Sequence, residues 1–405
     1  MSILVMKFGG TSVADPDRIR NAALKVKREV EAGWNVAVVV SAMAGETNRL
    51  VGLVRGIGSL YDAREYDAVV ASGEQVTSGL MALTLQSLGV PARSWQGWQI
   101  ALRTDAGHGA ARIGSIDTAP MLAKFEEGLH AVCAGFQGVA PDGRIATLGR
   151  GGSDTSAVAL AAALKADRCD IYTDVDGVYT TDPRVEPAAR KIPKIAFEEM
   201  LELASQGAKV LQTRSVELAM RYKVPLQVRS SFSDEPGTIV CDEDEIMESD
   251  VVTGVAFSRE EAKLTLLNVA DRPGIAAAIF GPLAEAGINV DMIVQNISEE
   301  NRTDMTFTVH LDDFDRAVAT IEAAKGDIGY EGLVADRDVA KVSVVGIGMR
   351  SHTGVAQRMF AALAQDGVNI QVITTSEIKV SVLIQRRYME LAVRSLHAAF
   401  RLEAA

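Results

Sequence analysis

The start of the chain places a lysine, two glycines and two hydroxyl groups directly after a short apolar run. In order, the segment reads Ile3, Leu4, Val5, Met6, Lys7, Phe8, Gly9, Gly10, Thr11 and Ser12. Asp15 and Pro16 follow, and an aspartate before a proline is typical of the start of a helix. This order predicts a strand, a glycine turn and a helix. The turn leaves backbone N–H groups open beside the positive end of the helix, so it fits a phosphate group, although it is not a Walker A loop.

The same alternation of strand and helix patterns continues to about Leu164. Apolar runs typical of strands lie at 36–40 and 131–134, and helical patterns lie at 47–60, 72–88 and 154–164. This alternation predicts an α/β fold with a mainly parallel sheet sandwiched by helices. Ligands of such sheets bind at the carboxyl ends of the strands, so the residues just after each apolar run are candidates for a site.

Several of these segments carry groups suited to a small ionic ligand. Ser41 and Thr47 flank a loop of small residues that opens a helix, and Glu74 lies in the first turn of the next helix. A glutamate there is a common structural feature, so Glu74 is a candidate only together with its neighbours. Residues 147–156 combine three glycines, Arg150, an aspartate and several hydroxyl groups before a helix, a composition with no core-packing purpose. Arg150 can bind a carboxylate or a phosphate through two hydrogen bonds.

The residues after the next apolar run form a turn rich in carboxylates. Asp174 and Asp176 suggest a calcium loop, but the glycine comes too early and no glutamate closes the loop. A nucleotide clamp fits better, with Tyr179 against a ring and Arg184 toward phosphate. Lys209 follows at another glycine, where a solvated lysine at a helix end is an equally good interpretation.

The composition excludes several classes of protein. At 405 residues, with 48% hydrophobic and 23% charged residues, the chain can build two or three domains with large cores. A formal net charge of -12 argues against nucleic acid or an anionic membrane as the main partner. Cys133, Cys169 and Cys241 lie far apart, so we expect no disulfide framework and a reducing compartment. The sequence shows no signal peptide or membrane span, and we expect a cytoplasmic protein.

An internal repeat organises the second half of the chain. Residues 274–293 align without a gap on residues 354–373, and eight of the twenty aligned positions are identical. Each copy reads as strand, helix, strand, strand, helix, strand, which predicts two α+β units of the βαββαβ type. The acidic run at 242–245 indicates an exposed linker before them. We therefore expect a first domain at 1–245 and two smaller domains at 246–337 and 338–405.

The glycine blocks, in this order and spacing, resemble the aspartate kinases of the amino-acid kinase family, and the repeats resemble the ACT module. The most specific blocks are 7–12 and 149–154, and the resemblance covers nearly the whole chain. It implies a kinase that moves the γ-phosphoryl group of ATP onto the β-carboxylate of L-aspartate, the first step toward lysine, threonine and methionine. It also implies Mg²⁺ bound through the ATP phosphates, no metal site made by the protein, and an amino-acid kinase fold followed by two ferredoxin-like ACT modules.

Together with the resemblance, the residues receive individual roles. Lys7 would stabilise the transferring phosphoryl group, and Asp154 would orient Lys7 and Lys209 around the phosphates. The expected ATP contacts are Lys7, Phe8, Gly9, Gly10, Ser41, Thr173, Asp174, Tyr179, Arg184 and Lys209. Arg150 would pair with the α-carboxylate of aspartate and Glu74 with its α-ammonium group. The remaining expected substrate contacts are Ser41, Thr47, Gly151, Gly152, Ser153 and Asp154.

ACT modules commonly bind amino acids between paired copies. By resemblance, the residues expected to contact threonine at one interface are Gly274, Ile275, Ala276, Gln295, Asn369 and Ile370. The candidates for lysine at the other interface are Asp291, Ser376 and Glu377. The copies are interleaved in this family, so the strand near 251–258 is expected to complete the second module. We expect a homo-oligomer through these modules, and Met247 would permit a shorter subunit that starts internally.

Three alternatives stay open at this point. Another amino-acid kinase would act on acetylglutamate, glutamate or UMP. A non-catalytic sensor would use the kinase half only to bind ligands, although both lysines and Asp154 argue against such decay. The two repeats could also serve only to dimerise the chain.

Overall fold

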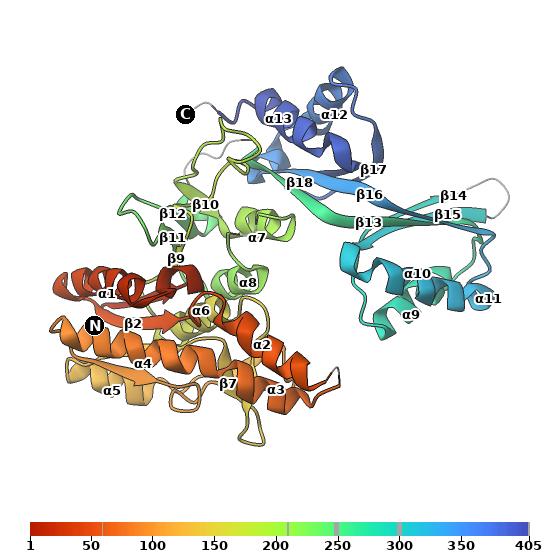
Figure 1. Ribbon diagram of the computed structural model, residues 1–405. Helices are drawn as coiled ribbons and strands as arrows, with labels where there is room; N and C mark the ends of the chain where they lie inside the picture. Colours follow the sequence, from red (N-terminus) through yellow and green to blue (C-terminus); the bar gives the residue numbers. More distant parts are fainter. Residues whose placement is uncertain (59, 209, 247–250, 298–301, 404–405) are drawn as a thin grey trace. The chain divides into compact units, whose positions relative to one another are not determined.

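The structure of the protein is a computed structural model that describes all residues except 59, 209, 247–250, 298–301 and 404–405. The described residues form two compact units (Figure 1). Unit 1 is formed by the described residues of Met1–Val178, Lys191–Ala204 and Lys209–Met247, and unit 2 by those of Tyr179–Arg190, Ser205–Ala208 and Glu248–Ala405. The described residues of unit 1 form a large and a small sheet, and those of unit 2 form one sheet.

Unit 1 is built on a mainly parallel sheet with the strand order β10-β12-β11-β9-β1-β2-β6-β3. The strands are β1 (Ile3–Phe8), β2 (Asn35–Val40), β3 (Ala92–Trp95), β6 (His130–Ala134), β9 (Arg168–Thr173), β10 (Lys194–Ala196), β11 (Leu226–Ser230) and β12 (Thr238–Cys241). Neighbouring strands from β11 to β3 run parallel, and β12 runs antiparallel to β11. The predicted α/β class with a mainly parallel sheet is confirmed.

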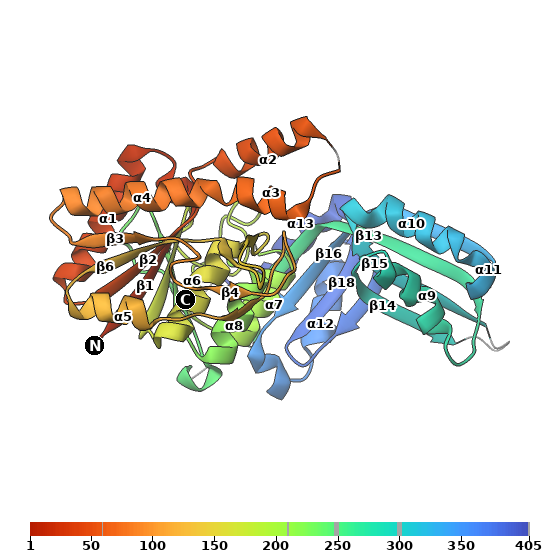
Figure 2. The same ribbon diagram turned by 90° about the horizontal axis from the view of Figure 1, so that it is seen from below.

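Helices cover both faces of this sheet, which Figure 2 shows between α1 and α4 on one side and α5 and α6 on the other. The helices are η1 (Gly10–Val13), α1 (Pro16–Glu31), α2 (Glu46–Ile57), α3 (Ala63–Val70), α4 (Ser72–Ser87), α5 (Ala119–Glu126), α6 (Gly152–Leu164), α7 (Phe197–Ser205) and α8 (Thr213–Tyr222). A smaller sheet has the order β5-β4-β7-β8. Its strands are β4 (Arg103–Thr104), β5 (Ile113–Ser115), β7 (Gln137–Val139) and β8 (Ile145–Thr147).

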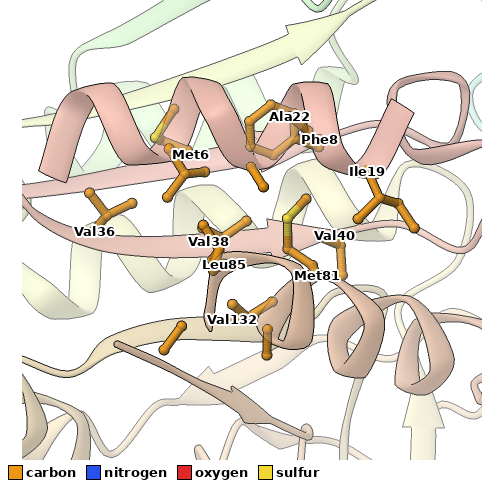
Figure 3. Packing of buried hydrophobic residues seen from close by; sticks show 14 of the residues in the cluster. Met6, Phe8, Ile19, Ala22, Val36, Val38, Val40, Met81, Leu85 and Val132 are labelled. Atoms are coloured by element: carbon orange, nitrogen blue, oxygen red, sulfur yellow. The ribbon is translucent and has the colours of Figure 1, made fainter. Parts of the chain in front are cut away.

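The core between the sheet and helices α1 and α4 decides where Lys7 points. Met6, Phe8 and Val38 from the strands pack there against side chains such as Met81 from the helices (Figure 3). Successive side chains of a strand point to opposite faces of its sheet. Lys7 lies between Met6 and Phe8, so it points to the opposite face, where α6 packs.

The predicted helix starts and ends follow local rules. The Asp15 side chain accepts the Arg18 N–H at 2.8 Å, and Pro16 is the first residue of α1, so the predicted cap is confirmed. The helix expected at 47–60 is observed as the shorter α2, which ends before Gly58. Glycine is a poor helix former, which favours an early end.

Unit 2 contains an antiparallel sheet with the strand order β14-β15-β13-β16-β18-β17 (Figure 1). The strands are β13 (Gly254–Ala270), β14 (Val290–Ile297), β15 (Arg302–His310), β16 (Gly332–Val345), β17 (Ile370–Thr375) and β18 (Lys379–Gln385). The helices are α9 (Ile275–Glu285), α10 (Phe314–Ala323), α11 (Lys325–Ile328), α12 (Val355–Gln365) and α13 (Met389–Ala399), with short 3₁₀ turns between elements. The two predicted α+β repeats are present.

The two repeats are interleaved through β13 and β16. Residues 261–270 of β13 pair with β15 and pack on α9 and α10, whereas residues 254–258 pair with the end of β16. Val252 and Val255 belong to the core under α12 and α13. The first strand of unit 2 thus adds to the core of the second repeat.

Within the described residues, no helix is both long and apolar enough to span a membrane.

Candidate functional site

A cleft of about 520 Å³ opens in unit 1 after the ends of β1 and β2 and at the N-terminal ends of α2, α4 and α6. Ligands of parallel α/β sheets bind at this edge. The predicted site residues that line the cleft are Lys7, Gly10, Ser41, Thr47, Glu74, Arg150, Gly151, Gly152, Ser153 and Asp154. The structure therefore brings the separate glycine and hydroxyl segments to one place.

Lys7 and Asp154 form an ion pair in this cleft. The Nζ of Lys7 lies 2.5 Å from Oδ1 of Asp154, and each residue is 8% exposed. Lys7 is held by β1, whereas Asp154 lies in the first turn of α6, near the positive end of the helix dipole. A buried ammonium group beside the free N–H groups of a helix N-terminus favours a polyanion such as a phosphate chain.

The turn after β1 brings its backbone close to the neighbouring loop. A Cβ on Gly10 would lie 2.9 Å from the Ala42 carbonyl oxygen, which explains the glycine. Gly10 begins η1 and lines the cleft, and the first N–H groups of a helix lack acceptors within it. Gly9 and Phe8 do not line the cleft. The Gly9 N–H donates to the Tyr172 carbonyl at 3.2 Å, and the buried Phe8 ring stacks on the Tyr172 ring, so the Gly9 amide and the Phe8 ring are already engaged.

Arg150 lies in a loop between two glycines in left-handed conformations. Gly149 has a φ of +79° and Gly151 a φ of +70°, and Gly151 caps α6. A Cβ on Gly151 would lie 2.0 Å from the Gln212 side chain. The Arg150 side chain is exposed, lines the cleft and has no hydrogen-bond or ion-pair partner within the described part of the chain. Its guanidinium group is available for a carboxylate of a ligand.

Glu74, in the first turn of α4, is a buried carboxylate of the cleft and only 3% exposed. Its Oε1 accepts the Ala42 N–H at 3.0 Å, whereas Oε2 is buried without a hydrogen-bond partner among the residues that the structure describes. Burial raises the pKa of Glu74 to about 7, and backbone hydrogen bonds oppose part of this rise. A buried carboxylate oxygen without a partner favours a cationic ligand group. This geometry supports a binding role over a purely structural one.

Hydroxyl groups line the cleft between these charges. Ser41 follows β2, and its N–H donates to the Phe8 carbonyl at 3.1 Å. Thr47 lies in the first turn of α2, and Ser153 lies in the first turn of α6. A hydroxyl group can donate or accept a hydrogen bond, so these side chains can contact either end of a zwitterionic ligand.

The residues expected to hold the rest of ATP are divided between the units. Thr173 ends β9, which pairs with β1, and its hydroxyl donates to Oδ1 of Asp174 at 3.1 Å. Tyr179 and Arg184 belong to unit 2, where Arg184 forms an ion pair with Asp182. Lys209 lies outside the described residues.

A second pocket, of about 430 Å³, lies in unit 2 between the start of α9 and β14. It is lined by Asp271, Arg272, Pro273, Gly274, Ile275, Ala276 and Gln295. Gly274 caps α9 with a φ of +90°, and Nε2 of Gln295 lies 3.5 Å from Oδ1 of Asp271. Asn369 and Ile370 lie at the start of β17 in the second repeat and do not line this pocket. The pocket thus gathers the predicted threonine contacts of the first repeat.

The predicted lysine contacts have different surroundings. Asp291 forms an ion pair with the buried Lys341, whose Nζ also lies 3.1 Å from Oε1 of Glu261. Burial lowers the pKa of Lys341, but the two carboxylates outweigh burial and raise its pKa overall. Ser376 and Glu377 lie in the exposed turn between β17 and β18. Asp291 is therefore already engaged with a cation.

Some residues of the cleft received no role from the sequence. They are Ala42, Met43, Ala44, Gly45, Asn48, Tyr66, Gly109, Phe136, Thr147 and Gly149. Most lie in the loops that contain Ser41, Thr47 and Arg150, and their position in these loops was the available signal. Phe136 follows the apolar run 131–134 and shares this signal. Tyr66 and Gly109 have no such signal, because only the packing of distant segments brings them to the cleft.

Comparisons with known proteins identify the families that the chain matches. A model of the amino acid kinase family matches residues 2–230, and models of the ACT domain match residues 264–326 and 342–400. The aspartokinase of Pseudomonas aeruginosa is 56% identical over 406 residues, which cover 100% of this chain and 98% of that protein.

Two solved structures of E. coli aspartokinase III are similar over most of their length. The complex with aspartate and ADP, in the R-state, has a TM-score of 0.82 at 30% identity and covers 98% of this chain and 99% of that one. The complex with lysine and aspartate, in the T-state, has a TM-score of 0.77 at 29% identity with the same coverage.

Proposed function

Because the chain belongs to the aspartate kinases of the amino acid kinase family, we propose that it transfers the γ-phosphoryl group of ATP to the β-carboxylate of L-aspartate. The products are 4-phospho-L-aspartate and ADP, and the reaction begins the route toward lysine, threonine and methionine. The similar E. coli aspartokinase III was solved with aspartate and ADP bound, which supports this substrate pair.

The observation that carries the proposal is a pair of opposite charges, both free for a ligand, in one cleft. The buried Oε2 of Glu74 and the guanidinium group of Arg150 both lack partners among the described residues. L-Aspartate carries an α-ammonium group and two carboxylates at neutral pH. Glu74 binds the ammonium group and Arg150 binds the α-carboxylate, which leaves the β-carboxylate to face Lys7.

The acceptor needs no general base, because a carboxylate with a pKa of about 3.9 is already ionised at pH 7. The obstacle is the repulsion between this anion and a phosphate chain whose charge spreads over the transferring oxygens. Lys7, the Gly10 N–H group and the N-terminus of α6 place positive charge beside that position. Asp154 orients the Lys7 ammonium group, since its Oδ1 lies 2.5 Å from Nζ.

The nucleotide extends from the cleft along the edge of the sheet, where Thr173 ends β9 and Asp174 follows it. Tyr179 and Arg184 remain nucleotide contacts proposed from the sequence, and Lys209 remains the proposed second lysine. In the part of the chain that the structure describes, no three His, Cys, Asp or Glu side chains gather as a protein metal site would require. We propose that Mg²⁺ is carried by the ATP phosphates, where its charge would offset that of the transferring group.

The activity is tested by trapping the product with hydroxylamine. We expect aspartyl hydroxamate to form only when Mg-ATP and L-aspartate are both present. Parallel reactions contain acetylglutamate, glutamate or UMP in place of aspartate, and ADP release is followed in each. Turnover of one of these instead would identify another amino-acid kinase. No turnover of any acceptor, at any salt or effector concentration, would leave the non-catalytic sensor.

The proposal includes feedback regulation by threonine, lysine or both at the ACT modules. Its support is the pocket with Gly274 and Gln295 in unit 2, together with the lysine bound to E. coli aspartokinase III. Asn369 and Ile370 lie in the other repeat, so a threonine site with all predicted contacts requires two repeats to face each other, as in a homo-oligomer. The hydroxamate assay with threonine, lysine and both tests the effectors, and light scattering tests the assembly. Met247, the candidate internal start, lies outside the described residues.

A further inference from the structure

A fully buried carboxylate holds the segment that leads to Arg150. Asp67, on α3, is 0% exposed. Its Oδ2 accepts the N–H groups of Thr147 and Gly109, both at 3.0 Å, and lies 2.8 Å from Nδ1 of His108. Its Oδ1 accepts the Thr147 hydroxyl at 2.5 Å.

These bonds join three segments of unit 1 beside the cleft. Thr147 is the last residue of β8, and both Thr147 and Gly109 line the cleft. The Ala111 N–H donates to the Thr147 carbonyl at 2.9 Å. Arg214, on α8, donates to the Leu148 carbonyl at 2.9 Å and to the Ala111 carbonyl at 2.8 Å. Asp67 and Arg214 thus hold the backbone up to residue 148. The glycine loop with Arg150 begins directly after it.

Packing alone does not account for a charge at this position. Burying a carboxylate is costly unless hydrogen bonds compensate for the lost water, and an apolar side chain would fill the space at lower cost. Hydrogen bonds to an ionised acceptor are short and directional, so they fix the backbone groups that donate them. The buried carboxylate of Asp67 therefore orients the backbone of Thr147 and Gly109, whose N–H groups donate to it and which line the cleft.

We propose that Asp67 is a positioning residue for the acceptor substrate. Asp67 holds Thr147 and Gly109, and through them it positions the Arg150 guanidinium group. This fixes Arg150, which binds the α-carboxylate, relative to Glu74, which binds the α-ammonium group. Asp67 itself does not line the cleft and is not a catalytic residue. This inference rests on the proposed function, because it takes Arg150 as the group that binds the α-carboxylate of aspartate.

The test is Asp67→Asn, which keeps the size of the side chain but turns an NH₂ group toward the donors. We expect the KM for aspartate to rise about 10- to 100-fold, because a small displacement of a binding group has effects of that order. The KM for ATP should stay within about twofold, since Asp67 contacts no predicted nucleotide residue. Thr147→Val should raise the KM for aspartate less, and Thr147→Ser, which keeps the hydroxyl, should restore it.

Asp105→Asn is the matched control. Asp105 lies in the same loop and accepts the N–H groups of Gly107 and Arg112, at 3.1 Å and 2.9 Å, but it is exposed and does not line the cleft. Its replacement should leave both KM values unchanged. The inference is overturned if folded Asp67→Asn binds aspartate normally, or if both KM values and kcat worsen together in proportion to a lower Tm. If Asp67→Asn does not fold, the comparison of Thr147→Val with Thr147→Ser decides.

Hydrogen exchange without substrate separates this inference from the proposed function. The peptides covering 105–112 and 145–153 should lose protection in Asp67→Asn, and the peptide covering 145–153 should keep its protection in Asp105→Asn. If the wild type makes no aspartyl hydroxamate, the proposed function fails, while this loss of protection would still show that Asp67 holds the loop. Unchanged protection of both peptides would show that it does not.

Discussion

The cleft of unit 1 and the pocket of unit 2 differ in how far their charged and polar side chains are buried. In the cleft, Lys7 and Glu74 are buried, and an oxygen of Glu74 is left for a ligand. In the pocket, Asp271, Arg272 and Gln295 are exposed, and they contact each other or nearby backbone. Charges that are kept from water act strongly on a transition state, whereas a sensing site needs only a different affinity in two states. Substitutions in the cleft should therefore change catalysis itself, and those in the pocket only its inhibition.

The largest effect is expected from Lys7→Ala, which removes the buried positive charge that we propose lies beside the transferring phosphoryl group. We expect kcat to fall about 10²- to 10³-fold, as for other groups that stabilise transition-state charge. Lys25→Ala is the control, because Lys25 is equally buried and pairs with Asp234 at 2.7 Å but does not line the cleft. It should lower Tm and leave kcat near normal. If Lys7→Ala kept a kcat near that of the wild type, the expected difference between the cleft, where substitutions change catalysis, and the pocket, where they change only inhibition, would be contradicted.

Arg150→Ala should act on substrate binding more than on the chemical step. We expect the KM for aspartate to rise about 10- to 100-fold, the usual loss for a hydrogen bond to a charged group. The KM for ATP should change little. Arg150→Lys should be intermediate, because a lysine keeps the charge but loses the paired geometry. An equal rise in both KM values would place Arg150 on the nucleotide instead.

The raised pKa of Glu74 predicts a pH dependence of aspartate binding. In the proposed site the ionised form binds the α-ammonium group, and burial raises the pKa of Glu74 to about 7 in the free protein. The KM for aspartate should therefore rise about tenfold for each pH unit below 7 and be level above it. Steady-state kinetics from pH 5.5 to 8.5 measure this.

Glu74→Gln serves as the control for this pH profile. It should bind aspartate weakly at every pH and lose the slope. Because folding raises the pKa of Glu74, protonation of its carboxylate stabilises the folded state. This contribution is complete at low pH and is lost as the pH rises through 7. Glu74→Gln should then unfold at a higher temperature than the wild type at pH 8. A slope that persists in Glu74→Gln would assign the titration to another group.

The smallest effect is expected from Gln295→Ala in the pocket of unit 2. We expect the threonine or lysine concentration for half-inhibition to rise about 2- to 10-fold, the effect of one neutral hydrogen bond. The kcat without effector should not change. Thr375→Ala tests the corresponding position of the second repeat, 80 residues later, and should have no such effect. Equal effects at both positions would show that the two repeats bind effectors alike.

Much of the fold could be predicted from the sequence because it depends on local patterns. Apolar runs of the right length formed the parallel strands, and Asp15 with Pro16 formed the start of α1. The repeat predicted two α+β units, since its glycines and apolar positions have the same spacing in both copies. The loops of the cleft were also predictable, because ligands of parallel sheets meet the ends of the strands.

Burial and pairing required the packed chain, because they depend on segments that are distant in sequence. No local pattern shows that Gly9 and Phe8 turn to Tyr172, or that one oxygen of Glu74 is left without a partner. Asp67 reads as an ordinary residue of a short helix, yet it accepts hydrogen bonds from segments 41 and 80 residues away. The residue types and their order thus come from the sequence, whereas the availability of each group for a ligand is set by the neighbours that folding brings to it.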